Sequence, residues 1–273
     1  MLACGGFSHF AATPTGHLDM WVEVLRFTFA WAVFFYAVAC AVTVLERAAG
    51  MAMRRSSKDH ENSVFVLAQG VGCTTKSLVV SVMGIVVIWI HWHESAQSHF
   101  DGSDLAFTAG MLFGSFEVMD LCTSFLHSML DPIQLVHHGV HIGIGCIMMY
   151  NCGPHFSTAI LLAQDLSSVP LNLYLLFRHR YPHHPAINAV YVVFAVVFVA
   201  VRIVLCTWGT YYYLTLYQDH LVEVEARLFP AWQAHLLAVA LVTGSMMQFG
   251  FFCKVVSNAL RMMRPEVPHK KAA

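Results

Sequence analysis

Polar side chains stand inside three successive apolar stretches in the middle of the sequence. Asp120 lies in the first stretch, and His137 and His138 open the second. Asp165 and Asn172 lie in the third. Ionisable and amide groups inside lipid-spanning helices are costly, and they usually face the interior of a bundle or a cavity. We therefore expect these side chains to line one polar pocket.

The residue types in this pocket suit general acid–base chemistry. An imidazole beside a carboxylate is a common general base, because the carboxylate fixes the tautomer and stabilises the imidazolium. Asp120 together with His137 or His138 would then deprotonate an amine or a hydroxyl that attacks a thioester. These three residues are our candidates for the catalytic group. The competing interpretation is that the histidines hydrogen-bond between helices and only specify packing.

Helical geometry predicts which of these side chains can meet. Asp120, His137, His138 and Asn172 all lie about 6–10 Å from the same end of their helices, given a rise of about 1.5 Å per residue. They can therefore share one layer of the bundle. His141 follows His137 by four residues, so the two imidazoles stack on one helix face.

A deeper layer carries charges of both signs. It holds Lys76, Glu117 and Asp165, and because unpaired charges there are expensive, we expect Lys76 to pair with Asp165 or Glu117. Arg202 lies about 9 Å from the opposite end of its helix, from where its side chain can snorkel to the interface. The side chains that we assign to substrate or lipid binding are Lys76, Glu117, His141, Asp165, Asn172 and Arg202.

The composition identifies the elements that must position these groups. The chain has 273 residues, of which 58% are hydrophobic and only 11% are charged, whereas soluble domains are about 25% charged. A membrane-spanning helix needs about 20 apolar residues. We therefore predict an all-α, polytopic membrane bundle of about seven transmembrane helices. The predicted spans are residues 21–45, 64–92, 105–127, 133–150, 155–177, 186–208 and 230–260.

These spans divide the chain into three regions. Residues 1–20 form a short lumenal tail, residues 21–260 form a single transmembrane domain, and residues 261–273 form a basic cytosolic tail. The net charge of −1 gives no argument for a nucleic-acid partner.

The basic residues predict the orientation of the chain. If the loop after the first span is cytosolic, the cytosolic segments hold eleven of the 15 Lys and Arg residues, and the lumenal segments hold only Arg227. This asymmetry is what the positive-inside rule describes. We therefore expect a lumenal N-terminus, a cytosolic C-terminus and a pocket near the cytosolic face. There Arg178, Arg180 and His183 would attract the phosphates of acyl-CoA.

The sequence ends in Lys270-Lys271-Ala-Ala. Lysines third and fourth from the end of a cytosolic tail have the form of a dilysine retrieval signal, which is an address read by a receptor. A basic tail that simply obeys the orientation rule is the competing explanation. We predict a location in the endoplasmic reticulum membrane, with another internal membrane as the alternative.

Three ordered motifs resemble the TLC-domain family, the TRAM–Lag–CLN homology region. The family's pattern has an Asp after aromatic and small residues in one span, a His-His pair opening the next, and an acidic residue followed by Ser, Pro and Asn in a third. Here the motifs are Phe116-Glu-Val-Met-Asp120, His137-His138 and Asp165-Leu-Ser-Ser-Val-Pro-Leu-Asn172. Arg202 also matches an Arg in the family's following span. The resemblance covers roughly residues 20–260.

The resemblance implies a protein that handles membrane lipids. The family includes ceramide synthases, which join a fatty acyl-CoA to a sphingoid base, and members tied to membrane-lipid composition or to membrane-protein handling. The synthases' motifs continue His-His-x-x-Thr and later His-Asp-x-Ser-Asp. This chain has His141 in place of the Thr, Gln164 in place of the later His and Ser168 in place of the final acid. A non-synthase member is therefore the closer match, acting in membrane-lipid homeostasis or in acyl transfer from acyl-CoA.

Two other functions compete with this interpretation. The clusters His137-His-x-x-His141 and His179-x-x-x-His183-His184 resemble the histidine boxes of di-iron lipid hydroxylases and desaturases, and imidazole suits iron. Alternatively, the chain is a non-enzymatic subunit of a larger membrane complex. For the favoured function we expect no cofactor and no metal. The expected partners are membrane lipids, acyl-CoA and either a second copy of the chain or other membrane subunits.

Overall fold

The computed structural model describes residues 14–48, 57–93, 103–129, 132–150, 155–178, 181, 184–215 and 231–263. Every element in this part of the chain is helical, which confirms the predicted all-α fold. The elements are α2 (Pro14–Ala48), α3 (Ser57–His91), α4 (Asp104–Leu126), α5 (Pro132–Tyr150), α6 (His155–Ala163), the 3₁₀ helix η4 (Gln164–Ser167), α7 (Ser168–Phe177), α8 (Pro185–Phe198), the π-helix η5 (Val199–Leu205) and α10 (Ala231–Met263).

Within the described residues, these elements form seven continuous helices, each of which is called a rod below. The segments α6, η4 and α7 run on as one rod, and α8 and η5 continue as helix to Thr215. Six rods are long and apolar enough to cross a membrane. The seventh is α5, whose 19 residues include three histidines. The chain is therefore a multi-pass membrane protein.

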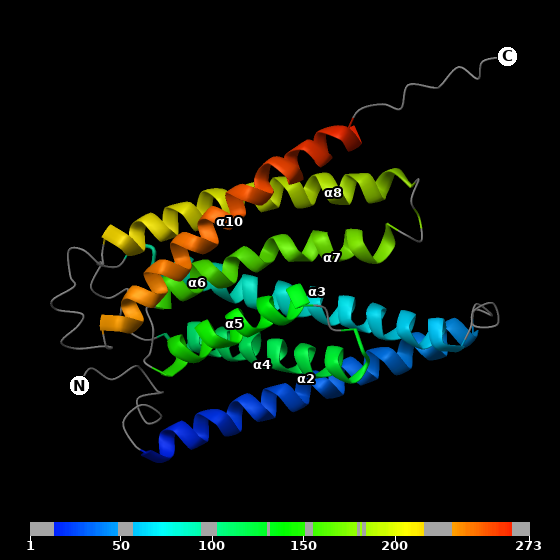
Figure 1. Ribbon diagram of the computed structural model, residues 1–273, viewed down its shortest axis with the longest axis horizontal. Helices are drawn as coiled ribbons and strands as arrows, with labels where there is room; N and C mark the ends of the chain where they lie inside the picture. Colours follow the sequence, from blue (N-terminus) through cyan, green and yellow to red (C-terminus); the bar gives the residue numbers. More distant parts are fainter. Residues whose placement is uncertain are drawn as a thin grey trace.

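Helix α3 lies at the centre of the bundle, as Figure 1 shows. It packs most extensively against α6, and it also contacts α2, α4 and α7. Helix α5 packs mainly against α4, whereas α10 packs against α8 and η5. Because α5 and α10 make no extensive contact with each other, the bundle is less tightly closed between them.

Two irregular helical segments face each other inside the bundle. Pro170 has no N–H to donate to the carbonyl of Leu166, and the preceding backbone is the 3₁₀ segment η4. The neighbouring rod widens into the π-helix η5 at the level where it packs against η4. π-Segments often occur at functional sites, so this crossing is a candidate position for one.

The packing of α2 against α3 and α4 shows how the apolar residues divide between core and lipid. Phe35 and Phe116 are almost completely buried in one cluster. Leu25, Phe29 and Val33 follow one another at four-residue spacing on α2 and are 64%, 71% and 54% exposed. Such a stripe on one helix face suits contact with acyl chains, because lipid takes the place of core packing on that side.

Gly84 of α3 allows α3 to approach α6 closely. A Cβ atom at this position would lie 2.7 Å from the carbonyl oxygen of Ala159 and 2.9 Å from the backbone nitrogen of Ala163. Because these are backbone atoms, Gly84→Ala is expected to destabilise the protein by about 1–3 kcal/mol. Thermal unfolding in detergent measures the effect. The control is Gly250→Ala in α10, where a Cβ would meet nothing within 4 Å; equal melting temperatures would contradict the argument.

Candidate functional site

A buried ion-pair network joins α3, α4 and η4. The Lys76 ammonium donates to Oδ2 of Asp165 at 2.7 Å and to Oε1 of Glu117 at 3.3 Å. Lys76 is only 6% exposed and Glu117 only 3%. The predicted pairing of Lys76 is confirmed, with both carboxylates rather than with one. The ammonium therefore links helices that are far apart in the sequence.

His138 of α5 lies between two buried carboxylates of α4. Its Nδ1 contacts Oε2 of Glu117, and its Nε2 lies 3.1 Å from Oδ2 of Asp120. Only an imidazole that carries a proton on both nitrogens can donate to both carboxylates. His138 is thus held as a bridge between α5 and α4, and the predicted pairing of Asp120 with a histidine is realised by His138.

Gln69 of α3 provides a further hydrogen bond to Asp120. Its side-chain nitrogen donates to Oδ1 of Asp120 at 2.9 Å and to the hydroxyl of Ser124 at 3.1 Å. Gln69 was not among the site residues predicted from the sequence. A signal was present, because Gln69 precedes Lys76 by seven residues, which is two helical turns on one face.

Asp165 and Arg202 are connected through the hydroxyl of Ser168. Asp165 accepts from the hydroxyls of Ser77 and Ser168, both at 3.2 Å. Arg202 donates from Nε to Ser167 at 2.7 Å and from Nη2 to Ser168 at 3.1 Å. The expectation that Arg202 snorkels to the interface was wrong. Its guanidinium turns inward from η5 toward η4, because the two serines provide acceptors inside the bundle.

Two further histidines of α5 stand in front of this network. The ring centroids of His137 and His141 are 4.1 Å apart, as their four-residue spacing predicts. Nδ1 of His141 lies 3.7 Å from Oε2 of Glu117, which is too long for a hydrogen bond, and it has no hydrogen-bond partner among the described residues. His137 is exposed and, in the described part of the chain, pairs with no carboxylate.

The two predicted layers of polar groups are one network in the structure. Glu117 joins them, because one of its oxygens accepts from Lys76 and the other contacts His138. Asn172 is different: it is half-buried and makes no hydrogen bond or ion pair with the network as far as the structure describes it. The expectation that Asn172 shares the layer of Asp120 and the histidines therefore stays a prediction. Asn172 lies on α7, two turns beyond Asp165.

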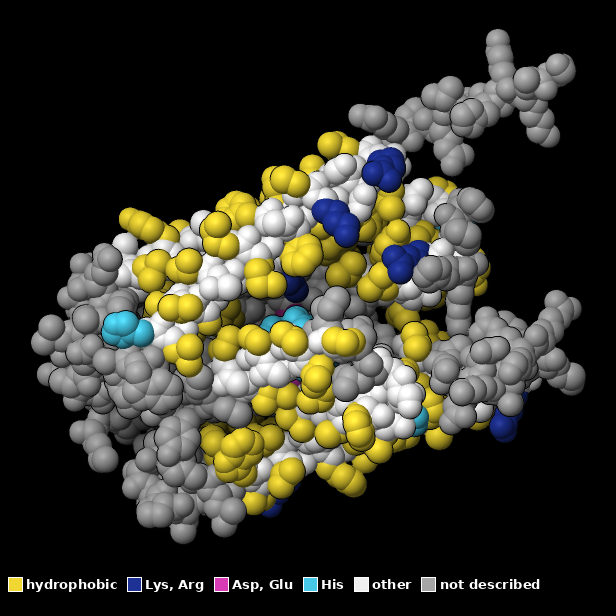
Figure 2. All heavy atoms as spheres, viewed as in Figure 1, with side chains coloured by type: hydrophobic (Ala, Val, Ile, Leu, Met, Phe, Trp, Pro, Cys, Tyr) yellow, Lys and Arg dark blue, Asp and Glu magenta, His cyan; other side chains and the backbone are white. Residues whose placement is uncertain are grey.

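A large cavity lies beside the network, between α5 and α10. Its volume is about 1170 Å³, and its wall is mostly apolar. Polar side chains on the wall include His137, His141, Gln164, Asp165 and Arg202. Figure 2 shows the hollow between these two helices, with His and Lys or Arg side chains visible inside it. The wall thus presents two imidazoles, an amide, a carboxylate and a guanidinium to a mostly apolar cavity.

No group of three or more His, Cys, Asp and Glu side chains in the described ranges is arranged to hold a metal ion. The first predicted histidine box, on α5, is present as helix, with His138 engaged by carboxylates. His179 and His183 of the second predicted box lie outside the described residues. The prediction of a di-iron site is therefore not tested.

Comparison with known protein families supports the motifs. The model of the family described as TLC domain matches residues 66–257, which is well over half of the chain. This range includes every residue of the buried network. A comparison with curated protein sequences found no match. From the family match, the membrane helices and the ordered motifs together, we conclude that the chain belongs to the TLC-domain family.

Proposed function

We propose that this protein handles membrane lipids by holding an acyl chain in the cavity, and that it transfers an acyl group from acyl-CoA to a lipid hydroxyl or amine. The observation that carries the proposal is the mostly apolar cavity of about 1170 Å³ with imidazoles on its wall. Pockets for small molecules measure about 300–1,000 Å³. The cavity is therefore large enough for a lipid chain, and its polar wall supplies the chemistry.

His137 is the proposed general base, because its ring lines the cavity. It accepts the proton of the hydroxyl or amine, whose oxygen or nitrogen forms a bond to the thioester carbonyl carbon. The carbon–sulfur bond then breaks. The departing thiolate takes the proton from the His137 imidazolium, so coenzyme A leaves as a thiol. His138 and Asp120 act as positioning residues, since their contact fixes the rotation of α5 against α4.

The departures from the ceramide synthase motifs support an acceptor other than a sphingoid base. His141 and Gln164 replace a Thr and a His of those motifs, and both line the cavity. We place the activity in membrane-lipid homeostasis. The proposed location is the endoplasmic reticulum membrane, and it rests on the dilysine tail at Lys270 and Lys271, which lies outside the described residues.

Filling the cavity tests this function. Gly244 and Gly250 both lie on α10, and a Cβ at either position would meet nothing within 4 Å. Only Gly244 lines the cavity. Gly244→Trp is therefore expected to abolish the change in cellular lipids that expression of the protein causes, whereas Gly250→Trp retains it. Lipidomics of a knockout line expressing each variant at equal abundance measures this, and an undiminished lipid change with Gly244→Trp would refute the role of the cavity.

A further inference from the structure

Arg202 has hydrogen-bonding capacity that the protein does not use. A guanidinium carries five N–H donors, and Arg202 gives one to Ser167 and one to Ser168. The other three have no partner among the described residues, and no carboxylate in that part of the chain pairs with Arg202 directly. Unused donors deep in a membrane protein cost free energy. Because Arg202 lines the cavity, an occupant of the cavity can accept from them.

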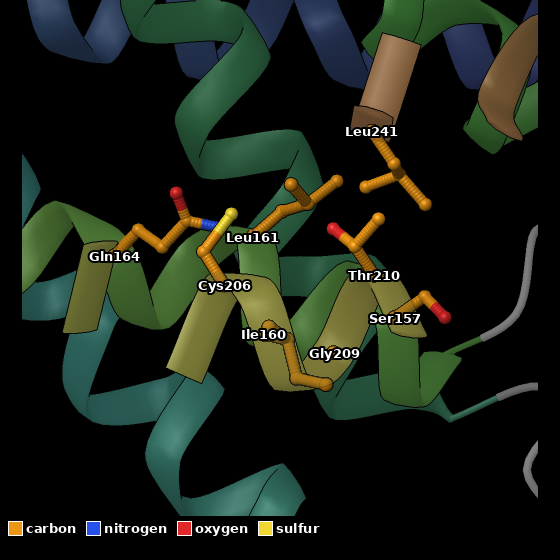
Figure 3. Close-up of a pocket in the computed structure, with 8 residues that line it drawn as sticks. All are labelled: Ser157, Ile160, Leu161, Gln164, Cys206, Gly209, Thr210 and Leu241. Atoms are coloured by element: carbon orange, nitrogen blue, oxygen red, sulfur yellow. The ribbon is translucent and has the colours of Figure 1, made fainter. Parts of the chain in front are cut away.

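Gln164 adds an unused neutral donor to the same wall. The residue is only 8% exposed, and its side-chain nitrogen has no hydrogen-bond partner in the described structure. Figure 3 shows this nitrogen directed toward Cys206, in a small recess of about 10 Å³. Gln164, Leu161, Cys206 and Leu241 line both the recess and the large cavity. The amide therefore lies where the recess meets the cavity, on the segment that packs against the π-helix of Arg202.

Carboxylates already surround this wall in the described structure. Glu117, Asp120 and Asp165 belong to the network behind it, where Lys76 pairs with two of them and His138 lies between Glu117 and Asp120. Asp104 also lines the cavity. An anionic ligand would add a net negative charge to a buried cluster, close to Asp165, at an electrostatic cost. A neutral acceptor oxygen satisfies the spare donors without that cost.

We propose that Arg202 and Gln164 form a binding site for the carbonyl oxygen of a neutral acyl lipid, an ester or an amide, whose chain occupies the cavity. The site rests on the proposed function, because it assigns the polar end of the lipid that the cavity holds. The carbonyl oxygen has two lone pairs, so it accepts from the guanidinium and from the amide together. Hydrocarbon on either side of the carbonyl lies against the apolar wall.

Competition among matched sixteen-carbon probes tests the site. The full-length protein in phosphatidylcholine nanodiscs is labelled with a photoactivatable analogue of methyl palmitate. The competitors are methyl palmitate, which is an ester, and N-methyl palmitamide, which is an amide. Methyl hexadecyl ether is the matched competitor that lacks the carbonyl. A hydrogen bond from a charged donor strengthens binding more than one from a neutral donor, so at least one carbonyl compound should compete at about tenfold lower concentration than the ether. Palmitate tests the anionic alternative.

Two variants locate the effect. Arg202→Gln removes the charged fork, and Gln164→Glu replaces the amide donor by a group of nearly the same shape with acceptor oxygens. In each variant, the carbonyl compound is expected to compete at nearly the same concentration as the ether. The concentration at which the ether competes should not change. If Arg202→Gln does not fold, which its melting temperature reports, Gln164→Glu decides.

Three results would overturn the proposal, and they are distinguishable. Equal competition by ester, amide and ether would leave a lipid cavity without a carbonyl site, so the proposed function would stand alone. Stronger competition by palmitate than by either carbonyl compound would identify an anion site instead. If none of the competitors reduced the labelling, lipid binding in the cavity would be refuted, and with it the proposed function.

Discussion

Replacing His137 by Gln is expected to abolish the lipid change caused by expression of the protein, with protein abundance close to that of the wild type. The proposed base is lost, and general-base catalysis contributes about 10²–10⁴-fold to a rate. The fold tolerates the change because His137 is exposed at the cavity and pairs with no carboxylate in the described structure. Acyl transfer in isolated membranes and cellular lipidomics both measure the result.

Neighbouring positions on α5 provide the controls. Leu135→Ala changes a side chain that is 47% exposed and is not part of the cavity wall, so activity should persist. His138→Ala should instead reduce abundance, because it leaves Glu117 and Asp120 without the imidazole between them. Full activity in His137→Gln would show that His137 is not the base.

Replacing Lys76 by Met should produce the largest loss of stability of any single change in the network. The ammonium is the shared partner of Glu117 and Asp165, and Met preserves most of its length and apolar volume. Removing one partner of a buried ion pair costs about 3–5 kcal/mol, because the remaining charge is left uncompensated. We expect little folded protein and a melting temperature in detergent far below that of the wild type.

A paired substitution separates loss of charge from loss of packing. Lys76→Met combined with Asp165→Asn removes one ammonium and one carboxylate, so part of the lost stability should return. Lys254→Met on α10 alters an exposed lysine and should shift the free energy of unfolding by no more than about 0.5 kcal/mol. A normal melting temperature for Lys76→Met alone would mean that the network does not hold the helices together.

The network and the cavity have different tasks in this arrangement. Lys76, Glu117 and His138 are buried and bonded to one another, so they fix the relative positions of α3, α4 and α5. His137 and His141 lie on the cavity side of the same helix. A rigid support behind two accessible imidazoles is the arrangement that a positioned general base requires. Substitutions in the support should therefore act on stability first, and substitutions at the wall on activity.

Much of the architecture was readable from the sequence, because hydropathy and helix length are local properties. The apolar segments predicted the membrane helices, and burying a charge without a partner is costly enough that Lys76 was expected to find a carboxylate. The order of Asp120, the His-His pair and Asp165 also identified the family before the match over residues 66–257.

The tertiary structure alone decided which side chains meet. Successive residues on a helix point about 100° apart, so either His137 or His138 could have faced α4. The rotation of α5 placed His138 between the carboxylates and His137 at the cavity. Arg202 turned inward for the same kind of reason, because the packing of η5 against η4 placed two serine hydroxyls within its reach. Depth along a helix follows from residue number, but rotation about its axis is set by the packing of neighbouring helices.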